Sequence, residues 1–203
     1  MSRRLNHLFT LLLLAAPVAM LVPSGANAQS TAAKILEKSR TQAREIEELR
    51  KILNGPDQNM RLATFDAMVK SGDEAMRQIA YEAGLASADS VMRAMTFKTL
   101  MMSKDNLHLT LTPDPTAPKQ LQDASAGLLS KEGNGFVVPM KRKNMDEGKF
   151  DTGSGEGQIS GLEFVFTYAA SKGSLTLQDD NSLSGTVQLN WGRTQFLAKA
   201  KLR

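Results

Sequence analysis

Apolar and polar residues alternate through the last part of the chain, from about residue 157 onward. Four runs follow this pattern: Leu162, Phe164, Phe166 and Tyr168; Leu175 and Leu177; Leu183, Val187 and Leu189; Phe196, Ala198, Ala200 and Leu202. Side chains two apart on a β-strand share one face of the sheet. Turn-forming residues at 171–173, 179–182 and 190–193 separate the runs. The pattern predicts an antiparallel meander with one buried face.

The middle of the chain is less regular. Leucines alternate with polar residues from Leu107 to Leu111, which predicts a first strand, and residues 136–138 predict another. The segments without such alternation are 113–118, a proline-rich stiff loop; 121–129, a short helix or an irregular stretch; 141–143, a basic but solvated loop; and 148–157, a glycine-rich hairpin. We therefore expect about six strands, arranged as a small sandwich or barrel.

The front of the chain has helical spacing instead. Residues 31–53 lack glycine and proline, and Ile35, Ile46, Leu49 and Leu53 recur along one side. An Asn-Gly-Pro sequence follows and ends the helix. The segment is predicted to be an amphipathic helix on its own domain, or a weak homo-oligomer contact through a coiled coil.

A repeat with a 32-residue period follows. Asp57, Met60-Arg61 and Phe65 recur as Asp89, Met92-Arg93 and Phe97, and the second helix between them is expected to span Glu74 to Ala83, with Gly84 ending it. Asp57, Asp73 and Asp89 each stand where an N-cap is needed. Over residues 56–103 the chain resembles a HEAT-type helical repeat. The resemblance implies a protein-binding scaffold.

Together these patterns predict an α+β fold. Helical hairpins come first, at residues 29–104, and an antiparallel β domain follows at residues 105–203.

The first 28 residues have the features of a secretory signal peptide. Arg3 and Arg4 precede an apolar run at 8–22, and small residues lead up to a cleavage site after Ala28. We expect a periplasmic or secreted protein, with no transmembrane segment after cleavage. The chain has no cysteine, so it must fold without disulfides.

Charge and chemistry exclude several classes of function. Removing the leader leaves 23 basic and 21 acidic residues, and this near balance argues against a nucleic-acid partner. His108 would be the only histidine, and no nucleophile motif or zinc-ligand set accompanies it. A glycosidase that uses a pair of carboxylates needs no histidine, so these observations do not exclude that class of enzyme. We predict a non-enzyme without cofactor or metal, in which Met92 and Met95 pack between helices and do not bind copper with His108.

The sequence then leaves two classes of binding function. The first is an adaptor that docks a macromolecule, another exported or envelope protein, through Arg61, Arg77 and Arg93 if these point outward. The alternative is a carrier of a small ligand, a lipid or a sugar, in which Phe166, Tyr168 and Trp191 line a pocket in the β module. Trp191 lies at a hairpin tip, where it either covers the core or meets a ligand.

Overall fold

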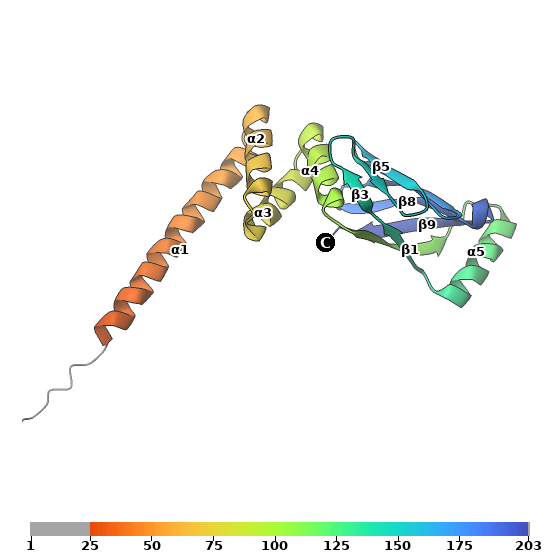
Figure 1. Ribbon diagram of the computed structural model, residues 1–203, viewed down its shortest axis with the longest axis horizontal. Helices are drawn as coiled ribbons and strands as arrows, with labels where there is room; N and C mark the ends of the chain where they lie inside the picture. The colour runs from red at the N-terminus through yellow and green to blue at the C-terminus, as the bar shows by residue number, and fades with distance from the viewer. Residues whose placement is uncertain (1–24, 203) are drawn as a thin grey trace, which may run out of the picture. The chain divides into compact units, whose positions relative to one another are not determined.

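The computed structural model describes residues 25–202, with side chains from residue 31 (Figure 1). Its helices are α1 (Gly25–Leu53), α2 (Gln58–Lys70), α3 (Glu74–Leu85), α4 (Ser90–Met102) and α5 (Lys119–Glu132). The chain divides into two units within α1, residues 1–44 and residues 45–203. Most of the proposed leader lies outside the described residues. Within residues 25–202, no helix combines the length and apolar character needed to cross a membrane.

The three aspartates of the repeat cap three helices, as predicted. The Asp57 carboxylate accepts a hydrogen bond from the backbone amide of Met60, at the start of α2. The Asp73 and Asp89 carboxylates do the same at the starts of α3 and α4. These bonds satisfy amide groups that have no partner inside the helix, so the repeat fixes where each helix begins.

Gly84 has a different role from the one expected. Helix α3 continues through Gly84 to Leu85, so the glycine does not end it. A β-carbon at Gly84 would lie only 2.0 Å from Oγ1 of Thr96 on α4. The missing side chain therefore lets α3 and α4 approach closely, which is a packing role that the sequence pattern does not reveal.

The helices have a small core of their own. Leu53 at the end of α1 packs with Phe65, Met68, Tyr81 and Met92 from the next three helices. Most methionines in this region are buried or half-buried here or against the sheet, as expected for side chains that fill gaps between helices.

The β region is one antiparallel sheet of nine strands. The strands are β1 (Asn106–Pro113), β2 (Gly135–Pro139), β3 (Lys141–Asn144), β4 (Lys149–Asp151), β5 (Glu156–Ser160), β6 (Glu163–Tyr168), β7 (Ser171–Leu177), β8 (Ser182–Leu189) and β9 (Thr194–Lys201). Their order across the sheet is β2-β1-β9-β8-β7-β6-β5-β4-β3. The α+β class is therefore confirmed, while the expected number of strands was too low.

The two edge strands of this sheet are consecutive in the chain. Only Met140, a buried residue, separates β2 from β3. The sheet must therefore curl until its opposite edges meet at Met140, which gives an open half-barrel.

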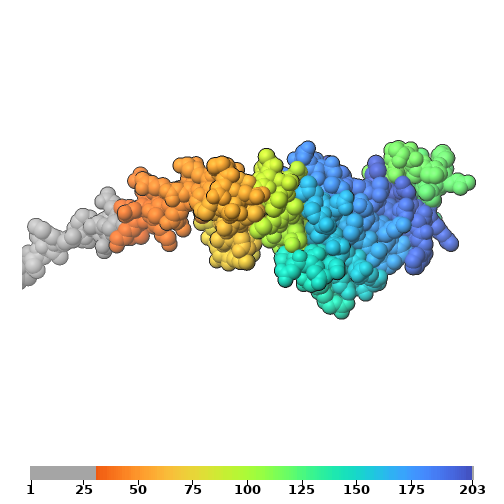
Figure 2. Space-filling model, turned by 90° about the horizontal axis from the view of Figure 1, so that it is seen from above, coloured from red at the N-terminus to blue at the C-terminus, as the bar shows by residue number. Residues whose placement is uncertain are grey.

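Side chains fill the interior of the half-barrel. The inward residues of β1 and β6–β9, including Leu109, Phe164, Leu175 and Phe196, are buried in one cluster. Phe97, Met101 and Met102 of α4 belong to the same cluster, and α5 packs against β1 and β9 (Figures 1 and 2). Residue 104 is therefore not a break in packing, because α4 and the sheet share a core.

Two local expectations were wrong, and one open alternative is decided. Residues 171–173 are part of β7, and the turn between β6 and β7 is Ala169-Ala170. Gly173 lies within the strand, at a position where a β-carbon would lie 2.3 Å from the Phe166 ring. The basic segment 141–143 is strand β3 and not a loop, with Arg142 paired to Asp151. Of the two alternatives for residues 121–129, the helix is confirmed, since these residues lie in α5.

Candidate binding groove on the outer face of the sheet

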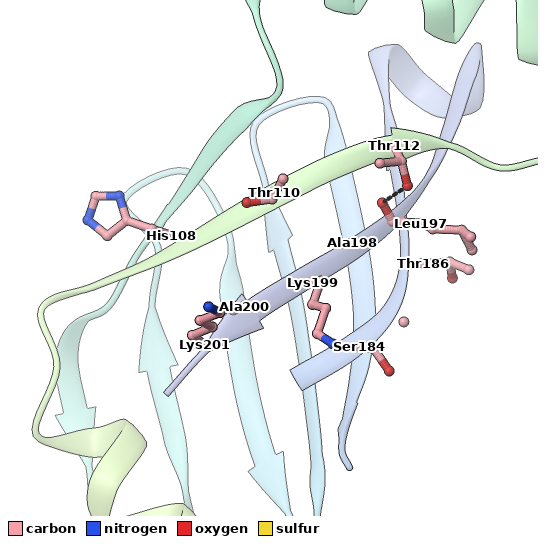
Figure 3. Close-up of a pocket in the computed structure, with 11 residues that line it drawn as sticks. His108, Thr110, Thr112, Ser184, Thr186, Leu197, Ala198, Lys199, Ala200 and Lys201 are labelled. Atoms are coloured by element: carbon pink, nitrogen blue, oxygen red, sulfur yellow. Dashed lines mark hydrogen bonds between the residues drawn. The ribbon is translucent and has the colours of Figure 1, made fainter. Parts of the chain in front are cut away.

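The outer face of the sheet carries a groove of about 900 Å³ across β1, β9 and β8 (Figure 3). Alternation along the strands creates it, because Leu107, Leu109 and Leu111 turn inward and leave His108, Thr110 and Thr112 outside. The same alternation on β9 turns Ala198 and Ala200 inward. Ala198 and Ala200 therefore border the groove through their backbone, together with Gly185 of β8.

Hydroxyl groups and basic side chains line this groove. The hydroxyls belong to Thr110, Thr112, Ser184 and Thr186, and the basic side chains are Lys199, Lys201 and His108. Leu197 adds an apolar side chain that is 41% exposed. Apart from Leu197, the outward side chains can donate hydrogen bonds, and the lysines add positive charge.

The Asp180 carboxylate pairs with a lysine of the groove and is held in place. Its Oδ1 accepts hydrogen bonds from the Ser182 hydroxyl at 2.6 Å and the Ser182 amide at 2.9 Å. Its Oδ2 lies 3.3 Å from Nζ of Lys199. The bonds from Ser182, followed by that from Lys199, lower the pKa of Asp180 to about 2. Lys201 is exposed and pairs with no carboxylate of the described residues.

The three predicted ligand residues do not share one pocket. Phe166 is buried in the core and Tyr168 is half-buried beside it, and both rings contact Phe136 at centroid distances of 6.2 and 6.3 Å. Trp191 is 85% exposed, so the expectation that it covers the core was wrong. Its backbone is in the left-handed region, with a φ of 59°.

Trp191 borders a smaller cavity of about 410 Å³. Thr167, Lys172 and Gln188 line it together with the Ala169-Ala170 turn. The Trp191 amide donates a hydrogen bond to the Ala170 carbonyl at 2.9 Å, which fixes the tip over the cavity.

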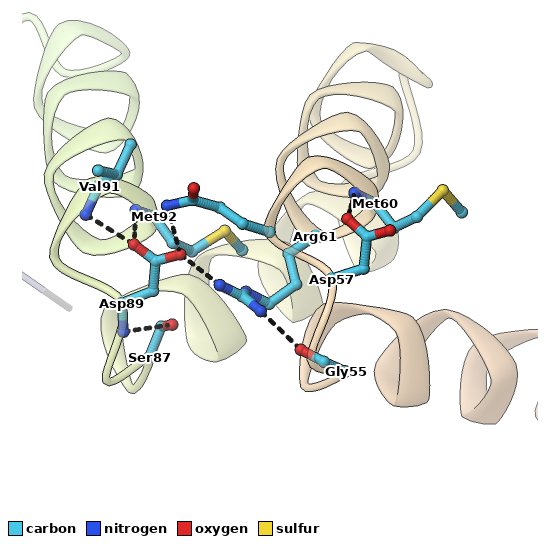
Figure 4. Close-up of polar contacts among 9 residues, drawn as sticks. Gly55, Asp57, Met60, Arg61, Ser87, Asp89, Val91 and Met92 are labelled. Carbon is cyan, nitrogen blue, oxygen red and sulfur yellow. Dashed lines mark hydrogen bonds and ion pairs between the residues drawn. The ribbon is translucent and has the colours of Figure 1, made fainter.

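Two of the three predicted docking arginines form internal contacts and do not point freely outward. Arg61 donates hydrogen bonds to Asp89 and to the Gly55 carbonyl, and its side chain is 14% exposed (Figure 4). Arg93 pairs with Asp179 at 2.9 Å and is 17% exposed. Their outward placement, which the prediction required, is therefore not met. The physical reason is that each arginine finds a carboxylate far along the sequence.

Arg77 is the most exposed of the three and lines a cavity of about 470 Å³. It pairs with Glu74 at 2.6 Å, and the other polar residues of the cavity are Gln78, Tyr81, Ser103 and Lys104. Burial raises the pKa of Tyr81, and the Ser103 hydroxyl partly offsets that effect.

The possible metal ligands lie in separate places. Met92 and Met95 pack in the helical core, while His108 lines the outer groove. Asp179 pairs with Arg93, and Asp180 pairs with Lys199. Within residues 25–202, no three His, Asp or Glu side chains group as a metal site would require.

Sequence reasoning missed the groove itself. Its polar residues are the outward half of the same alternation that predicted the core, so the signal for an outer face was present. The signal for a groove was not, because the adjacency of β1 and β9 depends on pairing between residues such as Thr110 and Lys199.

Known proteins offer no comparison for this site. No family model matches the chain, and neither the curated proteins nor the solved structures gave a match.

Proposed function

We propose that this chain is an exported, non-enzymatic binding protein that docks another exported or envelope protein across the outer groove. The observation that carries the proposal is the 900 Å³ groove that runs over three strands and is lined by hydrogen-bond donors. An extended peptide segment fits an open groove of this kind, because its carbonyl oxygens and acidic side chains can accept those hydrogen bonds.

The charge of the groove supports an acidic segment in the partner. Lys201 is unpaired within the described chain, and Lys199 has one carboxylate at 3.3 Å. Exposed charges at the border of an interface mainly affect the rate of association and its salt dependence. We therefore propose that binding is strongest at low ionic strength.

The packing of the β module argues for outer-face docking over a carrier with an internal pocket. Phe164, Leu175, Val187 and Phe196 fill the interior and are fully buried. A small-ligand role stays as a second candidate because an exposed indole borders the 410 Å³ cavity, and such rings stack on sugars.

The helical region supports a scaffold role as well. The capped helices follow the repeat that resembles a HEAT-type unit, and repeats of this type present surfaces to other proteins. Of the three predicted docking arginines, Arg77 is the one that we still propose as a docking residue, because it lines a polar cavity.

Site-specific photo-crosslinking in an exporting host tests the proposal. A photoreactive residue at Thr186, in the groove, should capture a partner protein, whereas one at Glu163, outward on β6, should not. The double variant Lys199→Glu/Lys201→Glu should abolish the crosslink, and Lys119→Glu on α5 should leave it intact. Equal capture at both positions, or capture that ignores the charge reversal, would contradict the proposal.

A further inference from the structure

The first part of α1 carries both apolar and charged side chains, and no described residue covers them. All side chains from residue 32 to residue 44 are exposed, and Ile35 and Leu36 are 60% and 57% exposed. A lone helix in water is marginally stable even when its residues favour helix. This segment, residues 32–44, is called the basic arm below.

The basic arm separates apolar from charged residues. At 100° per residue, Ala32, Ile35, Leu36 and Ala43 share one face with Ser39. The opposite face carries Lys34, Glu37, Lys38 and Arg44, and Arg40 lies at the border of the apolar face, about 40° from Leu36. Four basic residues and one acidic residue give the arm a net charge of +3.

The apolar side chains at the other end of α1 are already packed in the helical core. Leu53 is buried and Leu49 is half-buried in the helical core, so the unit from residue 45 onward uses that end of the helix. Only the arm itself needs a covering surface.

We infer that the basic arm lies on the surface of an anionic phospholipid bilayer. Its apolar face would enter the region between headgroups and acyl chains, and its basic residues would meet the negative headgroups. The arm is too polar to span a bilayer, and no described helix is apolar enough to do so. The inference is independent of the partner groove and would hold the docking protein at a membrane.

Charge argues against a second copy as the occupant. Two arms side by side would bring one +3 segment against another, which is unfavourable. The heptad core positions between Ile35 and Ile46 are Ser39 and Gln42, and two polar layers in succession weaken a coiled coil. An anionic surface compensates the charge and tolerates these polar positions.

Vesicle co-sedimentation tests the inference on the protein recovered after processing by an exporting host. The probes are vesicles of phosphatidylcholine alone and vesicles with about one third phosphatidylglycerol. The protein should bind the anionic vesicles and leave neutral ones largely unbound, and added salt should release it.

Three variants make the result specific. Ile35→Asp/Leu36→Asp alters the apolar face, and Lys38→Glu/Arg40→Glu reverses two charges. Each should weaken binding by at least about tenfold. Lys119→Glu/Lys131→Glu on α5 makes the same charge change elsewhere and should stay within about twofold of the native protein. The groove crosslink should survive both arm variants, which separates this inference from the proposed function.

Several outcomes would overturn the inference. These are no binding to anionic vesicles, equal binding to both vesicle types, or binding that the arm variants leave unchanged. Sedimentation analysis supplies another: a dimer that Ile35→Asp/Leu36→Asp dissociates, without vesicle binding, would assign the arm to a second copy.

Discussion

The Arg61 guanidinium and the Asp89 carboxylate join the first turn of α2 to the N-cap of α4. The equivalent arginine one repeat later, Arg93, reaches the β7–β8 turn, where it pairs with Asp179 at 2.9 Å and with the Gln178 carbonyl at 2.7 Å. The same motif position thus joins helix to helix in one copy and helix to sheet in the next.

Replacing Asp89 by Asn should make the free energy of unfolding less dependent on pH in the acid range. Arg61 is the largest cause that lowers the pKa of Asp89, to about 2, and it outweighs the opposing effect of burial. An unfolded aspartate has a pKa near 4. The pairing therefore stabilises the native state above about pH 4, and that contribution is lost as the pH falls from about 4 to about 2.

Urea denaturation of both proteins at several pH values provides the measurement. The native protein should be the more stable of the two near pH 6, and the difference should shrink toward zero near pH 2. Asn keeps an oxygen that can cap α4, so the comparison isolates the charge. A difference that stays constant across this range would show that the ion pair does not matter.

Gly84→Ala should destabilise the protein by about 1–3 kcal/mol, because the new methyl group would overlap Thr96, which is fully buried. Gly127→Ala is the matched control, since Gly127 lies in α5 with open space around it. That change should be neutral or should stabilise by up to about 1 kcal/mol. Equal effects at the two glycines, measured by urea denaturation, would refute the close-packing role of Gly84.

Local patterns predicted well what depends on neighbours in sequence. The aspartate caps and the inward Phe164 and Phe166 follow from spacing alone. Strand β3 was not predicted, because three of its four residues are basic and, at the edge of the sheet, its side chains are mostly exposed. The ion pair of Arg93 was not predicted, because its partner, Asp179, lies 86 residues further along the chain. The groove was not predicted either, because it depends on the pairing of β1 with β9, which are far apart in the sequence.

Trp191 should report an exposed environment in the folded protein. Its ring is 85% exposed at the tip after β8. Emission should therefore be close to that of free tryptophan and should shift little on unfolding, and a soluble quencher should reach the ring in both states. As the only tryptophan, it gives an unmixed signal. A large red shift on unfolding would place the ring in a buried site and contradict this geometry.

Phe164 and its neighbour Val165 provide a direct test of the filled interior. Phe164 is fully buried, and its ring packs against Phe150 and Phe166 at centroid distances of 5.2 and 5.9 Å. Phe164→Ala should cost about 3–5 kcal/mol, because it removes these contacts and leaves a cavity in a packed core. Val165 points to the opposite face of the same strand, so Val165→Ala should cost no more than about 1 kcal/mol. Urea denaturation of both variants measures the difference, with circular dichroism to check that each still folds. A small loss for Phe164→Ala would mean that the half-barrel holds unfilled space, and the internal-carrier alternative would then regain its support.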